Sequence, residues 1–219
     1  MARPSMLYLF SYNSPSLSFG WSLALCKIVG NLITTSSIDG TYASAGDLIC
    51  ILQTISFLEV MHAAIGLVPS GVLLALMQWG GRTHFLLAIV RQIVEVQELP
   101  SVFITFMSWS ISEVVRYSHY ATSCIGICPS WLTYFRYTLF IPLYPIGVAP
   151  GEMWLMYQAL PFIKDRNLYS KVFDKLPFSY YSFVMIVLVF YPILWSKLYL
   201  HLFKQRRSKL KNHQKKKKI

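Results

Sequence analysis

Long apolar runs separated by short polar connections dominate the sequence. The runs lie at about 17–38, 47–67, 71–92, 99–120, 131–160 and 178–200. A helix rises about 1.5 Å per residue, so about 20 apolar residues cross the hydrocarbon core of a bilayer. The pattern therefore predicts an all-α integral membrane protein, a bundle of six transmembrane helices.

Two of these runs contain residues that interrupt helices. The interruptions are Gly80-Gly81-Arg82 in the third run and Pro142, Pro145 and Pro150 in the fifth. Glycine and proline are tolerated at membrane depth where other protein groups satisfy the freed backbone. We interpret both runs as spans, with the third as the weakest.

Composition and charge support the membrane assignment. Only 13% of the residues are charged, against about 25% in soluble domains. Of the net charge of +11, nine positive charges follow from Lys204 onward without any acid, which leaves 11 − 9 = +2 for the rest. Such a tail binds nucleic acid in some soluble proteins, but beside an apolar span it marks the cytoplasmic side. We therefore expect no nucleic-acid partner, a membrane domain over 1–203 and a basic cytosolic tail over 204–219.

The last four residues contain a candidate localisation signal. Lys216 and Lys217 stand at positions four and three from the end. This arrangement matches the dilysine retrieval signal of resident membrane proteins of the endoplasmic reticulum, which a receptor reads. With an even number of spans, the sequence predicts a multi-pass protein of that membrane with both termini in the cytosol.

Ionisable residues inside the predicted spans are candidate functional groups, because each is costly in lipid. Glu59 and His62 are three residues apart in the second span, and Glu113 and Arg116 are three apart in the fourth. Residues at this spacing share one side of a helix, so Glu113 and Arg116 can form an ion pair. Two interpretations stay open, since such groups serve function or only hold helices together.

The fifth span combines a cation, phenols and a carboxylate. Arg136 and Tyr137 lie near its start, and Tyr144 and Glu152 follow. A phenol and a carboxylate that face one apolar pocket can act as an acid–base pair. Tyrosines near span ends are, however, commonly interfacial anchors. No cysteine–histidine cluster has metal-ligand spacing, so no metal is predicted, and a disulfide between Cys124 and Cys128 stays open.

The segment FRYTLFIPLYPIGVAPGE, residues 135–152, resembles the core signature of the very-long-chain 3-hydroxyacyl-CoA dehydratases, a family first described as protein-tyrosine-phosphatase-like. The resemblance extends over roughly 8–200. Supporting motifs are Tyr8-Leu-Phe-Ser-Tyr12-Asn13, Leu58-Glu59 with His62, and Trp109-Ser-Ile-Ser-Glu113-Val-Val-Arg116-Tyr117.

The resemblance implies a six-span enzyme of the endoplasmic reticulum. Such an enzyme removes water from (3R)-3-hydroxyacyl-CoA to give trans-2-enoyl-CoA, the third step of fatty-acid elongation. It implies no cofactor, and other elongase subunits as partners. Phosphatase activity is not expected, because the sequence has no His-Cys-x5-Arg nucleophile loop.

The resemblance implies a catalytic role for two residues. Tyr144 corresponds to the catalytic tyrosine of a YPxG motif, and Glu152 to the catalytic glutamate. The family pattern implies a spacing of seven residues, whereas here the spacing is eight. One extra residue turns a helix by about 100°. Either Pro150-Gly151 absorbs it in a bulge or loop, or the pair is misaligned.

The other polar residues receive supporting roles. Arg136 either attracts the phosphates of CoA or anchors the span at the membrane surface. Two alternatives to the enzyme also stay open. One is a catalytically inert scaffold that binds elongase subunits or a regulator. The other is a transporter with Glu59, Glu113 and Arg116 along its path, although the sequence shows no inverted repeat.

Overall fold

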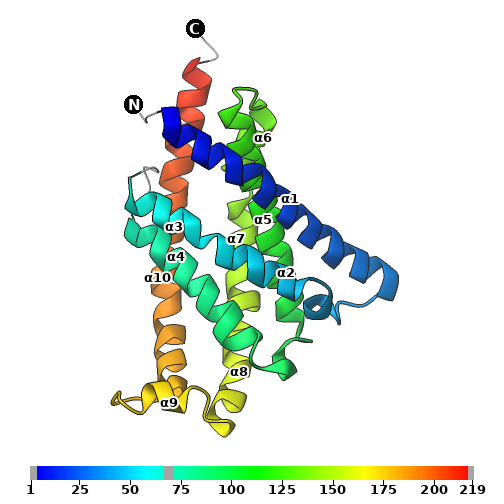
Figure 1. Cartoon of the computed structure of the whole chain (residues 1–219), viewed down its shortest axis with the longest axis vertical. Helices are drawn as coiled ribbons and strands as arrows, with labels where there is room; N and C mark the ends of the chain where they lie inside the picture. The colour runs from blue at the N-terminus through cyan, green and yellow to red at the C-terminus, as the bar shows by residue number, and fades with distance from the viewer. Residues whose placement is uncertain (1–3, 67–71, 217–219) are drawn as a thin grey trace.

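The computed structural model describes residues 4–66 and 72–216, and every regular element within these ranges is a helix. The side chains of residues 4–14, Leu74 and 209–216 fall outside this description. The predicted all-α class is confirmed. Figure 1 shows helical rods that run alternately along the long axis of the molecule.

The first half of the chain makes three passes. In chain order its elements are α1 (Pro4–Thr35), α2 (Thr41–Ile55), α3 (Phe57–Ala64), α4 (Val72–Thr83) and the π-helical η1 (His84–Val90). Helix α1 runs away from the end at the top of Figure 1, α2 and α3 return toward it, and α4 with η1 runs away again.

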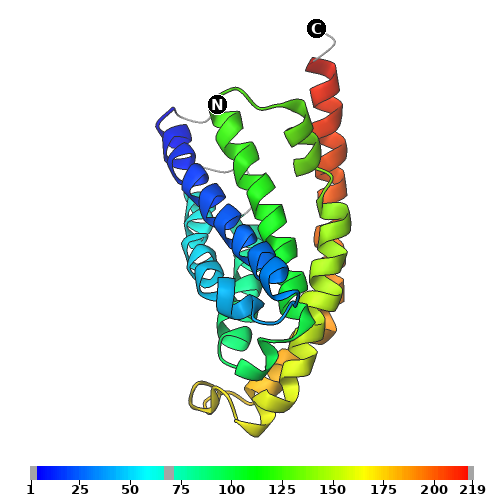
Figure 2. The ribbon, with the colours of Figure 1, turned by 90° about the vertical axis from the view of Figure 1, so that its right-hand side faces the viewer.

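The second half repeats this alternation. Its elements are the 3₁₀ turn η2 (Val94–Val96), α5 (Pro100–Cys124), α6 (Ser130–Arg136), α7 (Phe140–Ile146), the π-helical η3 (Gly147–Met153), α8 (Trp154–Asp165), α9 (Ser170–Phe173) and α10 (Tyr180–Lys216). Helix α5 rises to the top, α6 to α8 descend, and α10 rises again (Figure 1). The start of α1 and the end of α10 therefore lie at the same end, as Figure 2 also shows.

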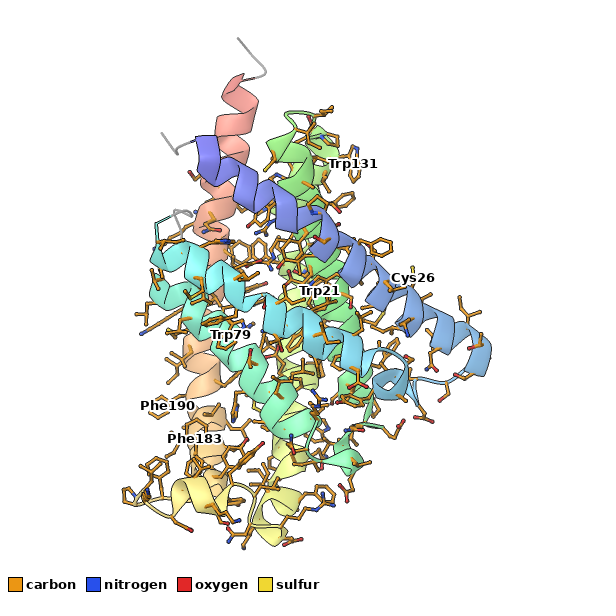
Figure 3. The ribbon with its side chains drawn as sticks, viewed as in Figure 1. Trp21, Cys26, Trp79, Trp131, Phe183 and Phe190 are labelled. Carbon is orange, nitrogen blue, oxygen red and sulfur yellow. The ribbon has the colours of Figure 1, made fainter. Side chains whose placement is uncertain are left out.

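Helix α5 is the central column of the bundle. It packs against α1, α2, α6, α7 and η3. On α1, Trp21, Ala24 and Ile28 are fully buried and recur at helical spacing toward α5. Figure 3 shows Trp21 over the middle of the bundle. The N-terminus of α5 is set by Pro100, because proline at the first helical position sacrifices no intrahelical hydrogen bond.

Within the described residues, four helical segments are long and apolar enough to cross a membrane. They are Pro15–Thr35, Thr41–Ala64, Ser130–Asp165 and Tyr180–Ser208. The predicted spans at 71–92 and 99–120 correspond to α4 with η1 and to α5, which are not among the four. Polar residues lower the hydropathy of both, notably Arg82 in α4 and Glu113 and Arg116 in α5. The count of six spans therefore stays a prediction.

The fifth predicted span is a continuous helical column despite its prolines. A turn separates α6 from α7, and α7, η3 and α8 then follow one another without a break. Pro145 and Pro150 lie inside helical segments. Large apolar side chains cover the outside of the bundle, among them Phe190 on α10, which is 53% exposed and points outward in Figure 3. Such a surface suits lipid rather than water.

Candidate active site

A cavity of about 470 Å³ lies inside the bundle, between α4, α5, α7, η3 and α10. Tyr144 and Glu152 both line it, so the structure brings the two sequence-predicted residues to one space. The walls are otherwise largely apolar, with Met77, Phe140, Leu143, Val148, Val187, Leu194 and Leu198 among them. The size and lining are typical of a small-molecule site.

Glu152 is held by two side chains from different helices. It is 5% exposed. Trp109 on α5 donates its indole N–H to Oε1 at 2.9 Å, and the Tyr191 hydroxyl on α10 donates to Oε2. A carboxylate accepts about four hydrogen bonds, so each oxygen keeps a lone pair beyond these contacts. The carboxylate is therefore fixed in orientation and still able to accept a proton.

Tyr144 is positioned by aromatic packing. Its ring is stacked with Tyr199, with centroids 5.9 Å apart and planes at 5°, and with Trp195 at 6.3 Å and 17°. Among the residues that the structure describes, its hydroxyl has no hydrogen-bond partner. The phenol is thus oriented by its ring, while its polar end is available to a ligand.

The π-helical segment η3 accommodates the unusual spacing of Tyr144 and Glu152. Hydrogen bonds in a π-helix join residues i and i+5, so one turn holds one residue more than an α-helical turn. The extra residue therefore fits within η3 without carrying Glu152 away from the cavity. The Ser101 hydroxyl on α5 donates to the Pro150 carbonyl oxygen at 2.7 Å and holds this wide turn against α5. Of the two possibilities left by the sequence, the structure shows the bulge.

Two glycines let η3 lie close against α5. A Cβ atom added to Gly151 would lie 2.5 Å from Oγ1 of Thr105, and one added to Gly147 would lie 3.2 Å from Cβ of Ser108. Small residues four apart commonly allow such close helix contacts in membranes. The glycine of the YPxG motif is therefore explained by packing that places Glu152 beside α5.

A buried charge network joins three helices next to the cavity. Glu113 on α5 accepts from Arg82 on α4 and from Arg116, in both cases at 2.5 Å. Arg116 also contacts both oxygens of Glu59 on α3, at 2.7 and 3.0 Å, and Tyr117 donates to the same carboxylate. The predicted pairing of Glu113 with Arg116 is confirmed. Two cations and two anions balance here, which offsets the cost of burying them.

Arg82 and Tyr191 are site residues that the sequence interpretation missed. Arg82 lines the cavity, and its guanidinium lies 4.8 Å from the centre of the Trp109 ring, a cation–π distance. The sequence pattern indicates an interruption of the third span at this residue, although an arginine inside a span is itself a functional signal. Tyr191 lies in a long apolar run, and nothing local distinguishes it from an interfacial tyrosine.

Other predicted residues lie away from the cavity. Arg136 has its Nη2 3.4 Å from the Tyr120 hydroxyl, and its guanidinium lies 5.7 Å from the ring centres of both Tyr120 and Tyr137. His62 is half-buried on α3 and does not line the cavity either.

The four cysteines are free thiols, including Cys124 and Cys128. In the described parts of the chain, no three His, Cys, Asp or Glu side chains gather as a metal site.

These features define a helical membrane protein with an internal cavity that holds a fixed carboxylate and a phenol. The chain belongs to the family described as protein tyrosine phosphatase-like protein, PTPLA, whose model matches residues 53–212. The match includes every polar residue of the cavity and of the charge network.

Named relatives of the chain are dehydratases. It is 36% identical to very-long-chain (3R)-3-hydroxyacyl-CoA dehydratase 2 of Homo sapiens, over 97% of this chain and 84% of that protein. It is 34% identical to very-long-chain (3R)-3-hydroxyacyl-CoA dehydratase 1 of Mus musculus, over 93% of this chain and 73% of that protein. It is also 34% identical to very-long-chain (3R)-3-hydroxyacyl-CoA dehydratase 3 of Mus musculus, over 97% of this chain and 59% of that protein. No solved structure matches the chain.

Proposed function

We propose that this protein dehydrates very-long-chain (3R)-3-hydroxyacyl-CoA to trans-2-enoyl-CoA, the third step of fatty-acid elongation. The observation that carries the proposal is the placement of Tyr144 and Glu152 on one apolar cavity. The family and the names of the relatives supply the substrate class.

The elimination needs one base and one acid. Glu152 takes the proton from C2, the electron pair forms the C2=C3 double bond, and the C3–O bond breaks. Tyr144 donates its proton to the leaving hydroxyl, which departs as water. Transfer of the proton from Glu152 to Tyr144 then restores both groups. The reverse assignment of acid and base uses the same two side chains.

The charge network supports this site rather than taking part in the chemistry. Glu59, Glu113 and Arg116 hold α3, α4 and α5 together, and through Glu113 they fix Arg82 at the cavity. Roles for His62, Arg136 and Tyr137 stay predictions, as do elongase subunits as partners.

The proposal includes six spans and cytosolic termini in the endoplasmic reticulum membrane, with 1–203 as the membrane domain and 204–219 as the tail. The alternating direction of the helices and the shared end of α1 and α10 support this topology (Figures 1 and 2). Lys217–Ile219 of the dilysine signal lie outside the described residues. Changing Lys216 and Lys217 to serine is expected to release the protein from the endoplasmic reticulum, as fluorescence microscopy of the tagged chain would reveal. Unchanged residence would remove the dilysine signal from the proposal.

The deciding experiment measures turnover of a 3-hydroxyacyl-CoA by the purified protein in detergent. Tyr144→Phe and Glu152→Gln should each lower kcat by about 100-fold or more, the size of general acid–base contributions. Tyr157→Phe and Glu95→Gln are matched controls, because both residues are exposed and lie outside the cavity. A folded wild type without turnover would favour the inert scaffold instead.

A further inference from the structure

A lysine and a histidine lie on α10 at one end of the cavity. Lys197 and His201 both line it, as does Tyr191, which contacts Glu152 from the same helix. At about 1.5 Å per residue, the two lie about 9 and 15 Å along α10 from Tyr191. The cavity therefore extends from the catalytic carboxylate toward the end of the bundle where the basic tail begins.

Carboxylates are absent from the parts of α5, α6, α7 and α10 that form this end, and Glu59 on α3, which returns to the same end, is paired with Arg116. No acidic residue occurs between Glu113 and Glu152, a stretch that covers α6, α7 and about the last three turns of α5, and none follows Asp174. Among the residues that the structure describes, every ion pair lies elsewhere, and Lys197 has no carboxylate partner. Within the described residues, the charge of Lys197 is therefore uncompensated by a carboxylate.

An uncompensated cation that lines a cavity suits an anionic ligand. Lysine binds phosphate as a point charge, and an imidazole N–H donates to a phosphate oxygen. The Gln205 amide donates to Nε2 of His201 at 3.1 Å, so Nδ1 of that ring carries the N–H for a ligand. The substrate class proposed above carries phosphates on CoA, separated from the reacting thioester by a long uncharged arm. In the cavity, Lys197 and His201 are likewise set apart from the carboxylate, about 9 and 15 Å along α10 from its partner Tyr191.

We propose that Lys197 and His201 bind the phosphate groups of CoA, so that the acyl chain enters the cavity with its thioester toward Glu152. This inference rests on the proposed function and adds a binding site on α10. Lys204, one turn beyond His201, extends the same edge of the helix toward the solvent. Exposed lysines near a span end commonly reach lipid headgroups, but Lys197 is distinguished by its place on the cavity wall.

The test compares two substrates with the same acyl chain. One is the 3-hydroxyacyl-CoA, and the other is the 3-hydroxyacyl-pantetheine thioester, which lacks every phosphate. Lys197→Gln with His201→Gln should raise KM for the CoA substrate by about tenfold, the loss expected for charge-assisted hydrogen bonds. The values of kcat, and KM for the pantetheine thioester, should not change.

Arg207→Gln is the matched control. Arg207 is exposed, does not line the cavity, and lies about 80° around α10 from Lys197, on the side away from His201. It removes the same kind of charge from the same helix and should leave both KM values unchanged. Arg136→Gln tests the rival assignment, and a rise in KM confined to the CoA substrate in that variant alone would overturn our proposal.

Other outcomes are equally decisive. An equal rise in KM for both substrates would show that the α10 variants disturb the cavity itself. Unchanged KM values, with weaker binding to vesicles containing anionic lipid, would make the pair a lipid contact. If the wild type turns over neither substrate, the proposed function fails, and equilibrium dialysis with free coenzyme A tests the α10 site separately. Weaker binding of coenzyme A by the double variant Lys197→Gln with His201→Gln would support the α10 site. Unaltered binding would overturn it.

Discussion

Trp109 joins the candidate catalytic carboxylate to the buried charge network. Its indole N–H donates to Glu152 at 2.9 Å, and its ring lies 4.8 Å from the guanidinium of Arg82, which pairs with Glu113. One side chain of α5 therefore touches both the group proposed for chemistry and Arg82, a member of the network that joins α3, α4 and α5. The orientation of Glu152 depends on this central helix as well as on its own segment.

Removing either hydrogen-bond donor should impair catalysis more than binding. Trp109→Phe and Tyr191→Phe keep most of the packing but leave one oxygen of Glu152 without its partner. A lost hydrogen bond to a charged group costs about 1.5–3 kcal/mol, so we expect kcat to fall about 10- to 100-fold with little change in KM. Steady-state kinetics of the purified variants would measure both constants.

The control for these variants is Trp131→Phe. Trp131 is 61% exposed on α6 and does not contact the cavity. Its kinetics should match the wild type. If Trp109→Phe and Tyr191→Phe instead raise KM and leave kcat unchanged, the two donors act on substrate binding, and their proposed role in orienting Glu152 is wrong.

The π-helical turn predicts a specific response to changes in chain length. Deleting Pro150 shortens the spacing of the pair from eight residues to seven, and the widened turn can close to an ordinary α-helical one. Because both forms direct Tyr144 and Glu152 to the cavity, the deletion should keep kcat within about fivefold of the wild type. Inserting one alanine after Ala149 adds a residue that the already widened turn cannot absorb. Glu152 would turn by about 100°.

We expect the insertion to lower turnover by about 100-fold or more, since it removes a general acid or base. Circular dichroism and size-exclusion chromatography would verify that both length variants fold. Full activity after the insertion, or loss of activity after the deletion in a folded protein, would show that η3 does not set the position of Glu152.

The sequence predicted the class of fold because hydrophobic runs of membrane length are visible without tertiary information. It also predicted the pair Glu113 and Arg116, since residues three apart share one side of a helix. It left open whether Pro150-Gly151 absorbs the extra residue in a bulge or the pair is misaligned, because a π-helical turn depends on how these residues pack against Ser101 and Thr105 of α5. Contacts of that kind join distant parts of the chain and leave no local pattern.

The same limit explains the missed site residues. Tyr191 is distinguished only by its partner Glu152, 39 residues away in the sequence. Arg82 carried a signal as an arginine inside a span, but the neighbouring Gly80-Gly81 favoured a break in the helix instead. In the structure both glycines lie within α4, where an added Cβ atom would meet nothing within 4 Å.

Glycine at position 151 should be far more sensitive to substitution than glycine at position 80. Gly151→Ala would place a methyl group 2.5 Å from Oγ1 of Thr105, and overpacking of this kind costs about 1–3 kcal/mol. We expect a lower thermal unfolding midpoint and reduced kcat. Gly80→Ala should be neutral or slightly stabilising, because alanine is the better helix former. Thermal unfolding in detergent would compare the two.

A second substitution tests the cause. The hydroxyl of Thr105 is buried and has no hydrogen-bond partner in the described structure, so Thr105→Ala loses little. Combined with Gly151→Ala, it removes the clashing oxygen and should recover most of the lost stability and turnover. Failure of this pair to recover either property would mean that glycine is needed at position 151 for a reason other than contact with Thr105.

The buried network should respond strongly to the loss of one charge. Glu113 is the anion shared by Arg82 and Arg116, and its side chain is 4% exposed. Glu113→Gln would leave an excess buried cation, and breaking a buried ion pair from one side costs about 3–5 kcal/mol. Released from Glu113, Arg82 should also lose its place at the cavity, so kcat per folded molecule should fall.

The comparison for this prediction is Glu95→Gln. Glu95 pairs with Arg166, but both side chains are about 40% exposed, and exposed pairs contribute about 0–1 kcal/mol. The two variants remove the same charge from buried and exposed ion pairs, so thermal unfolding should separate them clearly. Equal and small losses of stability would show that Glu113 is not an essential member of the network. A large loss of stability with unchanged kcat in the remaining folded protein would limit the network to holding the helices together.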